Sequence, residues 1–168
     1  MTHRIHSHCS YCGTTFPIDL AWPRRCARCE NTSFRNPIPV AVVLLPYDHG
    51  IIAIRRSIPP GQGELALPGG FLEVPDDWCV GGARELEQET GIRMDPHTID
   101  PHPYAVESTP DGTRLLIFGL AEPLVGALPP FTPSEETSER VILRAPTKLA
   151  FPIHTRILAR YFAERTGG

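Results

Sequence analysis

No stretch of this sequence approaches the roughly 20 consecutive apolar residues that a membrane-spanning helix requires. The N-terminal segment is polar and contains several histidines, so it also lacks the apolar centre of a secretion signal. These two absences argue against a transmembrane protein and against a secreted one. We therefore expect a cytoplasmic protein with no membrane partner.

The sequence also lacks a surplus of positive charge. Its formal net charge is −3 and its pI is about 6.1, whereas proteins that grip long nucleic acid present clustered lysine and arginine. A protein that binds nucleic acid over its whole surface is therefore disfavoured, although a local basic patch stays open. No internal repeat is present either.

The length and composition allow one well-packed domain and something smaller. With 168 residues, of which 41% are hydrophobic, the chain can bury one good core and leave a few dozen residues over. Prolines cluster around residues 96–110 and 123–133, where they indicate loops and sheet edges. We place a small module at residues 1–36 and the main domain at residues 37–168.

Four cysteines define the small module. Two pairs, each with two residues between its members, are separated by 13 residues, and they comprise Cys9, Cys12, Cys26 and Cys29. This spacing lets four thiolates converge on one tetrahedral zinc ion, which predicts a zinc ribbon. A pair of disulfides is the alternative, and the lack of an export signal argues against it. A site closed by four sulfurs has no open position for substrate, so we expect this zinc to be structural.

The remainder of the ribbon carries few further signals. Phe16, Ile18 and Trp22 are expected to supply its apolar contacts, and the nearby histidines at positions 3, 6 and 8 are expected to be solvated rather than ligands. Its arginines are too few to establish nucleic-acid binding; they are Arg24, Arg25, Arg28 and Arg35. A nucleic-acid partner is therefore unlikely but stays open through the ribbon, as does a role as a lid over the main domain.

Residues 77–90 are predicted to form a helix with one acidic face. At about 100° per residue, Glu85, Gln88 and Glu89 share that face. A separate, mostly apolar stripe is formed by Cys79, Ala83, Leu86 and Thr90, with Cys79 a buried thiol. Gly91 is a natural helix stop. Because carboxylates held this close repel one another, a hard divalent cation, Mg²⁺ or Mn²⁺, would remove the conflict; a solvated acidic surface is the alternative.

The residues around this helix resemble the Nudix box, whose pattern is G-x5-E-x7-R-E-U-x-E-E-x-G-U with U an aliphatic residue. Seven positions match in register: Gly70, Arg84, Glu85, Leu86, Glu89, Gly91 and Ile92. The preceding Leu-Pro-Gly-Gly-Phe run is also typical of the family, and the resemblance covers roughly residues 37–162. It departs at Asp76, where the family has Glu, and at Gln88, which replaces the first Glu of the Glu-Glu pair.

The resemblance implies an α/β fold, a Nudix α/β/α sandwich with a mixed β-sheet. It also implies Mg²⁺- or Mn²⁺-dependent hydrolysis of a nucleoside diphosphate linked to another moiety. Glu85 and Glu89 would be metal ligands, either of them could also accept the proton from the attacking water, and the Gly70 carbonyl would contribute from the loop. Gln88 would be a weak or water-mediated ligand. Arg84 would pair with Asp76, Glu73 or Glu85 and hold loop and helix together.

Nudix enzymes often place another acid near the metals, in the loop before the last strand. Here that loop is residues 134–139, and any of Glu135, Glu136 and Glu139 could fill the place and compensate for Gln88. We name Glu136 as the candidate ligand. A soluble acidic turn without such a role is the alternative.

Strands are expected at residues 40–45, 51–56, 104–108, 114–121 and 140–143, with a hairpin turn at residues 47–50. Arg55 and Arg56 end the second strand and point in opposite directions, so one of them could face the cleft and bind a substrate phosphate; solvent for both is the alternative. A C-terminal helix is expected from Pro152, with His154 on its surface.

A ribbon joined to such a domain through Phe34-Arg35-Asn36-Pro37 is similar to the NADH pyrophosphatase branch. That branch carries Ser-Gln-Pro-Trp-Pro-Phe-Pro after its box, whereas residues 102–106 here read His-Pro-Tyr-Ala-Val. ADP-ribose, a dinucleotide, a nucleoside triphosphate and a sugar nucleotide therefore stay open as substrates, and so does a homodimer. The competing hypothesis is a catalytically weak Nudix-fold sensor that binds a nucleotide and acts through its ribbon.

Overall fold

A computed structural model of the protein describes residues 5–166. It contains two compact units, one ending at Pro37 and the next beginning at Ile38. No helix within the described residues is long and apolar enough to cross a membrane.

The first unit is a small module built around cysteine sulfur and a few rings. Strands β1 (Arg24–Arg25) and β2 (Thr32–Ser33) pair antiparallel. Its buried centre contains Phe16 together with two of the cysteines. The Phe16 and Trp22 rings meet edge to face, with centroids 6.3 Å apart, and the Arg24 guanidinium lies 4.5 Å from the Trp22 centroid. Ile18 is 73% exposed, so its predicted packing role is wrong.

The second unit contains eight strands, two α-helices and one 3-10 helix within the described residues. In chain order they are β3 (Ile38–Leu44), β4 (Pro46–Tyr47), β5 (Gly50–Arg56), β6 (Leu65–Ala66), β7 (Gly69–Phe71), α1 (Trp78–Thr90), η1 (Pro96–Thr98), β8 (Ala105–Ser108), β9 (Arg114–Leu120), β10 (Thr137–Leu143) and α2 (Pro152–Thr166).

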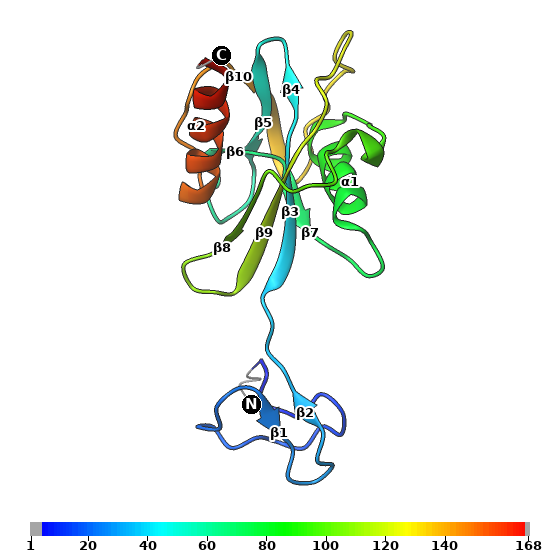
Figure 1. The fold of residues 1–168 in the computed structure, drawn as a ribbon, viewed down its shortest axis with the longest axis vertical. Helices are drawn as coiled ribbons and strands as arrows, with labels where there is room; N and C mark the ends of the chain where they lie inside the picture. Colours follow the sequence, from blue (N-terminus) through cyan, green and yellow to red (C-terminus); the bar gives the residue numbers. More distant parts are fainter. Residues whose placement is uncertain (1–4, 167–168) are drawn as a thin grey trace. The chain divides into compact units, whose positions relative to one another are not determined.

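These strands form two sheets. One has the order β7-β3-β9-β8, in which β3 and β9 are parallel and the other pairs antiparallel. The second has the order β10-β5-β4, with β6 also paired to β5, and it is antiparallel throughout. Figure 1 shows α1 and α2 on opposite sides of the strands. The α/β class and the mixed sheet expected from the sequence are confirmed.

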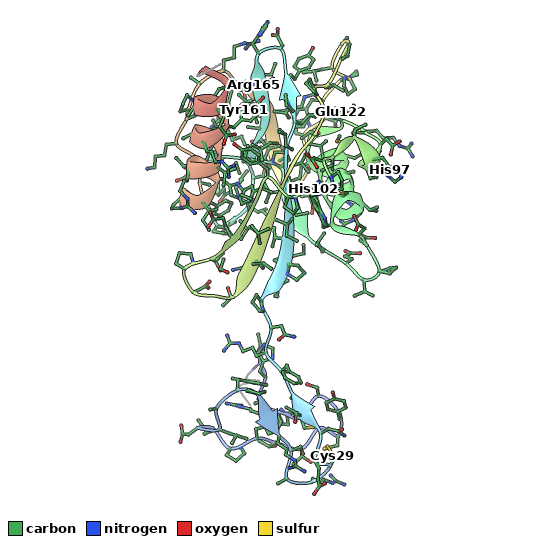
Figure 2. The ribbon with its side chains drawn as sticks, viewed as in Figure 1. Cys29, His97, His102, Glu122, Tyr161 and Arg165 are labelled. Carbon is green, nitrogen blue, oxygen red and sulfur yellow. The ribbon has the colours of Figure 1, made fainter. Side chains whose placement is uncertain are left out.

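The core lies on both faces of the strands because neighbouring strand residues point in opposite directions. Val42 and Ile51 pack in the cluster under α2, whereas Val43 and Ile52 pack in the cluster under α1. Tyr161, labelled on α2 in Figure 2, is buried in the first cluster. Because α1 and α2 cover the two sides, both faces of β3 and β5 are buried, and their sequences are nearly continuous apolar runs.

The first helix ends at Thr90 as predicted and begins at Trp78, one residue later than predicted, and both ends have clear local causes. The Asp77 side chain accepts a hydrogen bond from the Cys79 amide and caps the N-terminus, and Gly91 ends the helix with a left-handed φ of 71°. Leu86 and Thr90 are fully buried, as the apolar stripe predicts, while Cys79 is only half-buried.

The start of β10 and the burial of His154 differ clearly from the prediction. β10 begins at Thr137 rather than Arg140, because Thr137 and Glu139 pair across the sheet with Arg56 and Arg55, so half of the predicted acidic loop is strand. His154 is only 5% exposed and is not a helix-surface residue.

Candidate functional site

The site is assembled where the short strand β7 meets helix α1. A Cβ atom at Gly70 would lie 2.3 Å from Glu85 Oε2, and one at Gly69 would lie 2.3 Å from the Ala41 carbonyl oxygen. A side chain at position 69 would push against the backbone of β3, and one at position 70 would displace the Glu85 carboxylate. The two glycines therefore let the first acid of the helix lie directly against the loop backbone.

Glu85 and Glu89 are both buried, with exposed fractions of 9% and 5%. Glu89 Oε2 accepts a hydrogen bond of 2.8 Å from the Gly69 amide. Burial raises the pKa of Glu89 to about 8; the Gly69 hydrogen bond and the Arg56 charge oppose this shift, while Glu85 and Glu136 add to it. The pKa of Glu85 is also raised, by burial first and then by Glu136 and Glu73 against the opposing Arg84. The acids are thus crowded and poorly solvated.

Arg84 joins the loop to the helix. Its Nη1 donates to Glu85 Oε1 at 2.7 Å, its Nε donates to Asp76 Oδ2 at 3.3 Å, and its Nη2 donates to the Phe71 carbonyl at 3.0 Å. Two of the three partners considered from the sequence are therefore bonded, and Glu73 acts on the Arg84 charge without a hydrogen bond. Asp76 is one methylene shorter than the Glu of the Nudix pattern, and its carboxylate still reaches the Arg84 guanidinium.

The structure distinguishes among the three glutamates that precede or begin β10. Glu136 acts electrostatically on both Glu85 and Glu89. Its backbone is held at the end of β5, where the Ser57 amide donates to the Glu136 carbonyl at 2.8 Å. Glu139 is instead bonded to Arg55, at 2.7 Å.

A hollow of about 350 Å³ lies beside these acids. It is lined by Gln88, Glu89, Ser134, Glu135 and Glu136. Gln88 is exposed at its rim, while the Glu89 carboxylate is buried. The chain therefore brings a neutral amide and three carboxylates to one opening.

The two strand-end arginines have different surroundings. Arg55 donates through Nε to Glu139 and through Nη1 to the Gly63 carbonyl at 3.0 Å, so it is committed to the sheet and the following loop. Arg56 donates through Nε to the Pro60 carbonyl at 2.7 Å, and its positive charge acts on Glu89. Of these two arginines, Arg56 is therefore the one whose charge acts on Glu89.

His154 is a buried residue near the site that the sequence reasoning missed. Its ring meets those of Phe151 and Phe118, with centroids 5.0 Å and 5.5 Å away. Burial, with a smaller contribution from the Arg56 charge, lowers the pKa of His154 to about 3 and keeps the ring neutral. The signal was its spacing, since Leu158 and Tyr161 follow it by four and seven residues on the buried face of α2.

The four cysteine sulfurs of the first unit lie within 4.8 Å of one another. The pairs Cys9–Cys29 and Cys12–Cys26 are each separated by 3.6 Å, close to the roughly 3.8 Å between sulfurs that bind one zinc at about 2.3 Å tetrahedrally. All cysteines of the described residues are free thiols, so the disulfide alternative is wrong. Figure 2 labels Cys29 of this cluster. The histidines at positions 6 and 8 are not part of the cluster, and the one at position 3 lies outside the described residues.

Comparison with known proteins places these features in a family. The NUDIX domain model matches residues 35–160. The chain is similar to a NAD-capped RNA hydrolase NudC of Salmonella typhi, with 27% identity over 93 residues, which covers 55% of this chain and 36% of that protein. It is also similar to a MutT-like protein of Streptomyces ambofaciens, with 35% identity over 83 residues, covering 49% and 50%.

The chain thus spans half or less of the length of these curated relatives. Among solved structures, a NUDIX hydrolase from Nitrosomonas europaea superposes with a TM-score of 0.78 at 27% identity, covering 96% of this chain and 93% of that one. The family model, the fold and the acidic helix agree, and we conclude that the chain belongs to the Nudix hydrolase family.

Proposed function

We propose that this protein hydrolyses the diphosphate linkage of a nucleoside diphosphate derivative and that it requires Mg²⁺ or Mn²⁺. The observation that carries the proposal is the burial of Glu85 and Glu89 side by side, with Glu136 acting on both. Crowded, desolvated carboxylates are costly to ionise unless a cation joins them.

The residues present fit a hard divalent ion. Carboxylate and carbonyl oxygens are the ligands that Mg²⁺ and Mn²⁺ prefer, and Glu85, Glu89 and the Gly70 carbonyl would hold the ions. When bound, such ions neutralise charge on the diphosphate and lower the pKa of a water molecule. The protein's own contribution is to fix the ligands, and Arg84 does so by binding Glu85, Asp76 and the Phe71 carbonyl together.

Glu136 would supply the carboxylate that Gln88 lacks. Both residues line the same hollow, and the charge of Glu136 raises the pKa of both buried acids. Gln88 retains an amide oxygen, which is a weaker ligand for a hard cation and would bind directly or through a water molecule. The three carboxylates expected of the family would then come from α1 and from the segment just before β10 rather than from α1 alone.

Arg56 would bind a phosphate of the substrate. A guanidinium forms strong, charge-assisted hydrogen bonds to phosphate, and the Arg56 charge already acts on Glu89. Arg55, bonded to Glu139 and Gly63, would instead hold β5, β10 and the loop after β5 in place.

The experiment is a hydrolysis screen of the full chain with Mg²⁺ or Mn²⁺. The panel contains ADP-ribose, NADH, dinucleotides, nucleoside triphosphates and sugar nucleotides, and it includes NAD-capped RNA because one relative bears that name. We expect at least one nucleotide to be cleaved at its diphosphate, and Glu85→Gln to abolish cleavage. Arg25→Gln, a surface change in the ribbon, is the control that should leave the rate unchanged.

A nucleotide sensor with weak or no catalysis is the second candidate, and the observation that favours it is the amide at position 88. If the wild-type protein binds a nucleotide of the panel tightly but releases no phosphate or monophosphate from any of them, the sensor function replaces the hydrolase function.

A further inference from the structure

Arg140 is a half-buried cation in the middle of β10, and it has no acidic partner within residues 5–166. Its Nη1 donates to the Thr90 carbonyl at 2.7 Å, and its Nη2 donates to the Pro129 carbonyl at 2.6 Å. Burial lowers the pKa of Arg140, which shows that its charge is poorly solvated. Keeping a charge out of water without an acid beside it costs free energy, so the arginine points to a role that an apolar side chain would not fill.

The two carbonyls belong to different segments of the second unit. Thr90 is the last residue of α1, where backbone carbonyls have no partner within the helix and carry partial negative charge. Pro129 lies in the long loop between β9 and β10, which is drawn in yellow in Figure 1. Because the donors of a guanidinium form a rigid, planar fork, Arg140 holds these two carbonyls at a fixed spacing. It thus ties the end of α1 and the loop to β10.

The same two segments form the walls of the hollow beside the acids. Gln88 and Glu89 belong to the last turn of α1, and residues 134–136 end the loop just before β10. Arg140 therefore binds the residue that follows Glu89 on one wall, and it also binds the stretch of chain that leads into the other wall. Its contacts link the two walls to each other through one side chain.

A closed turn joins the loop to Glu136. The Ser134 hydroxyl accepts hydrogen bonds from the amides of Glu136 and Thr137, at 3.3 Å and 3.1 Å, and the Ser134 amide donates to the Thr137 carbonyl at 2.8 Å. The far end of the turn is held by the Ser57 amide, which donates to the Glu136 carbonyl at 2.8 Å. A displacement of the loop at Ser134 would therefore tilt the turn and move the Glu136 side chain.

The loop is held in two different ways along its length. Near its beginning, Leu124 and Leu128 pack against the cluster under α1. Residues 130–136 are all exposed except for the half-buried Phe131, whose ring centroid lies 5.6 Å from the Arg140 guanidinium. Arg140 therefore holds the part of the loop that apolar packing does not.

We propose that Arg140 is a positioning residue of the divalent-metal site, which holds the Glu136 carboxylate close enough to Glu89 for one ion to join them. It does so by binding the last carbonyl of α1 and the Pro129 carbonyl together. The inference rests on the proposed function, in which Glu136 supplies the carboxylate that Gln88 lacks. Arg140 itself touches neither the metal nor the substrate.

The first test is metal binding by the full chain without any nucleotide, so that the result does not depend on hydrolysis. Mn²⁺ is the probe, because the EPR signal of the free ion is lost on binding. Arg140→Met keeps an apolar stem and removes the donors, and it should lower Mn²⁺ affinity by about tenfold, the smaller end of the effect of residues that orient metal ligands. Arg144→Met is the matched control: Arg144 directly follows β10 and pairs with Asp48, so its removal should leave the affinity unchanged.

Double variants show whether Arg140 acts through Glu136. In a Glu136→Gln background, Arg140→Met should lower Mn²⁺ affinity by less than about twofold, because the ligand that it positions is already gone. In a Gln88→Glu background the loss should also shrink, since the new carboxylate lies on α1 itself. A loss as large in the Glu136→Gln background as in the wild type would overturn the proposal.

Hydrogen exchange followed by mass spectrometry locates the structural change. In Arg140→Met the amides of residues 130–137 should exchange faster, whereas those of residues 122–128 should exchange as in the wild type. Faster exchange throughout the second unit would show that Arg140 stabilises the whole domain, which also overturns the proposal. If the wild type binds Mn²⁺ and Arg140→Met binds it equally well, the positioning role alone is refuted. A wild type that binds no Mn²⁺ refutes the metal-dependent function, and with it the role of Arg140.

Discussion

At position 88 an amide stands where the Nudix pattern has a carboxylate, and the nearby Glu136 reaches the same hollow from a different element. We predict that Gln88→Glu raises Mg²⁺ affinity by about tenfold, since it adds an anionic oxygen to a site for a hard cation. Glu136→Gln should lower the affinity by a similar factor. Metal titration monitored by calorimetry checks both.

The double variant Gln88→Glu with Glu136→Gln provides the control. If Glu136 substitutes for the missing carboxylate, this variant should return close to wild-type affinity. Metal affinity that is indifferent to position 136 would show that Glu136 is not a ligand. Glu139→Gln should have no such effect, because Glu139 is bonded to Arg55.

His154 gives a second prediction at the residue scale, concerning stability in acid. Burial lowers its pKa from 6.5 to about 3, so between these values the unfolded chain binds a proton that the folded chain does not. Stability must then fall as the pH drops below 6.5. Relative to His154→Phe, the wild type should lose about 2 kcal/mol between about pH 7 and about pH 5.

Urea denaturation of both proteins at these two pH values measures the difference. The comparison with His154→Phe cancels contributions from the carboxylates, which titrate in both. A pH-independent difference between the two proteins would mean that the folded His154 is protonated at its ordinary pKa.

At the scale of elements, the approach of β7 to α1 depends on two adjacent glycines that face different obstacles. A Cβ at Gly69 would meet the Ala41 backbone, which cannot move without breaking β3, whereas a Cβ at Gly70 would meet only the end of the Glu85 side chain. We predict that Gly69→Ala destabilises the fold by about 2 kcal/mol or more, as overpacking against rigid neighbours does.

Gly70→Ala should destabilise the fold less than Gly69→Ala but lower the hydrolysis rate more. The Glu85 side chain can rotate away from the new methyl group, but it then leaves the acid cluster. Thermal melts and hydrolysis rates of the two variants should therefore rank in opposite order. If the same variant were the more impaired in both measurements, the close approach of β7 to α1 would not be what positions Glu85.

At this scale the sequence predicts those elements whose limits are set by neighbouring residues in the chain. The limits of α1 can be predicted to within one residue because Asp77 and Gly91 are local capping residues. Its acidic face can be predicted because the spacing of the acids matches the helix repeat. The start of β10 is not readable, since Thr137 and Glu139 join the sheet only by pairing with Arg56 and Arg55, about 80 residues earlier in the chain.

The same reasoning explains the site residues. Glu85 and Glu89 are predicted from one helix, but the proposal of Glu136 rather than Glu139 depends on tertiary contacts, since Glu139 is bonded to Arg55 and Glu136, just before β10, acts on Glu89. The proposed role of Arg56 rather than Arg55 depends on its tertiary surroundings, which include the Phe151 ring just before α2, 5.2 Å from the Arg56 guanidinium. Tertiary contacts of this kind are not encoded in any short window of sequence.

At the scale of the whole molecule, the chain has two units with separate buried centres, and the first contains little besides sulfur and a few rings. Modules this small rarely fold without a metal or disulfides, and its cysteines are free thiols. We therefore predict that purified protein releases about one equivalent of zinc on denaturation. Cys26→Ser, which removes a buried member of the cluster, should abolish that zinc.

The loss should be confined to the first unit. Because residues from Ile38 onward have their own clusters under α1 and α2, Cys26→Ser should become sensitive to proteases before Pro37 while the remaining fragment keeps a cooperative melt. Limited proteolysis with mass spectrometry, alongside colorimetric zinc release, measures both effects. Cys79→Ser is the matched control, since this thiol lies on α1 and should leave the zinc content unchanged. Protein that contains no metal yet resists proteolysis throughout would show that the four sulfurs hold the module together without zinc.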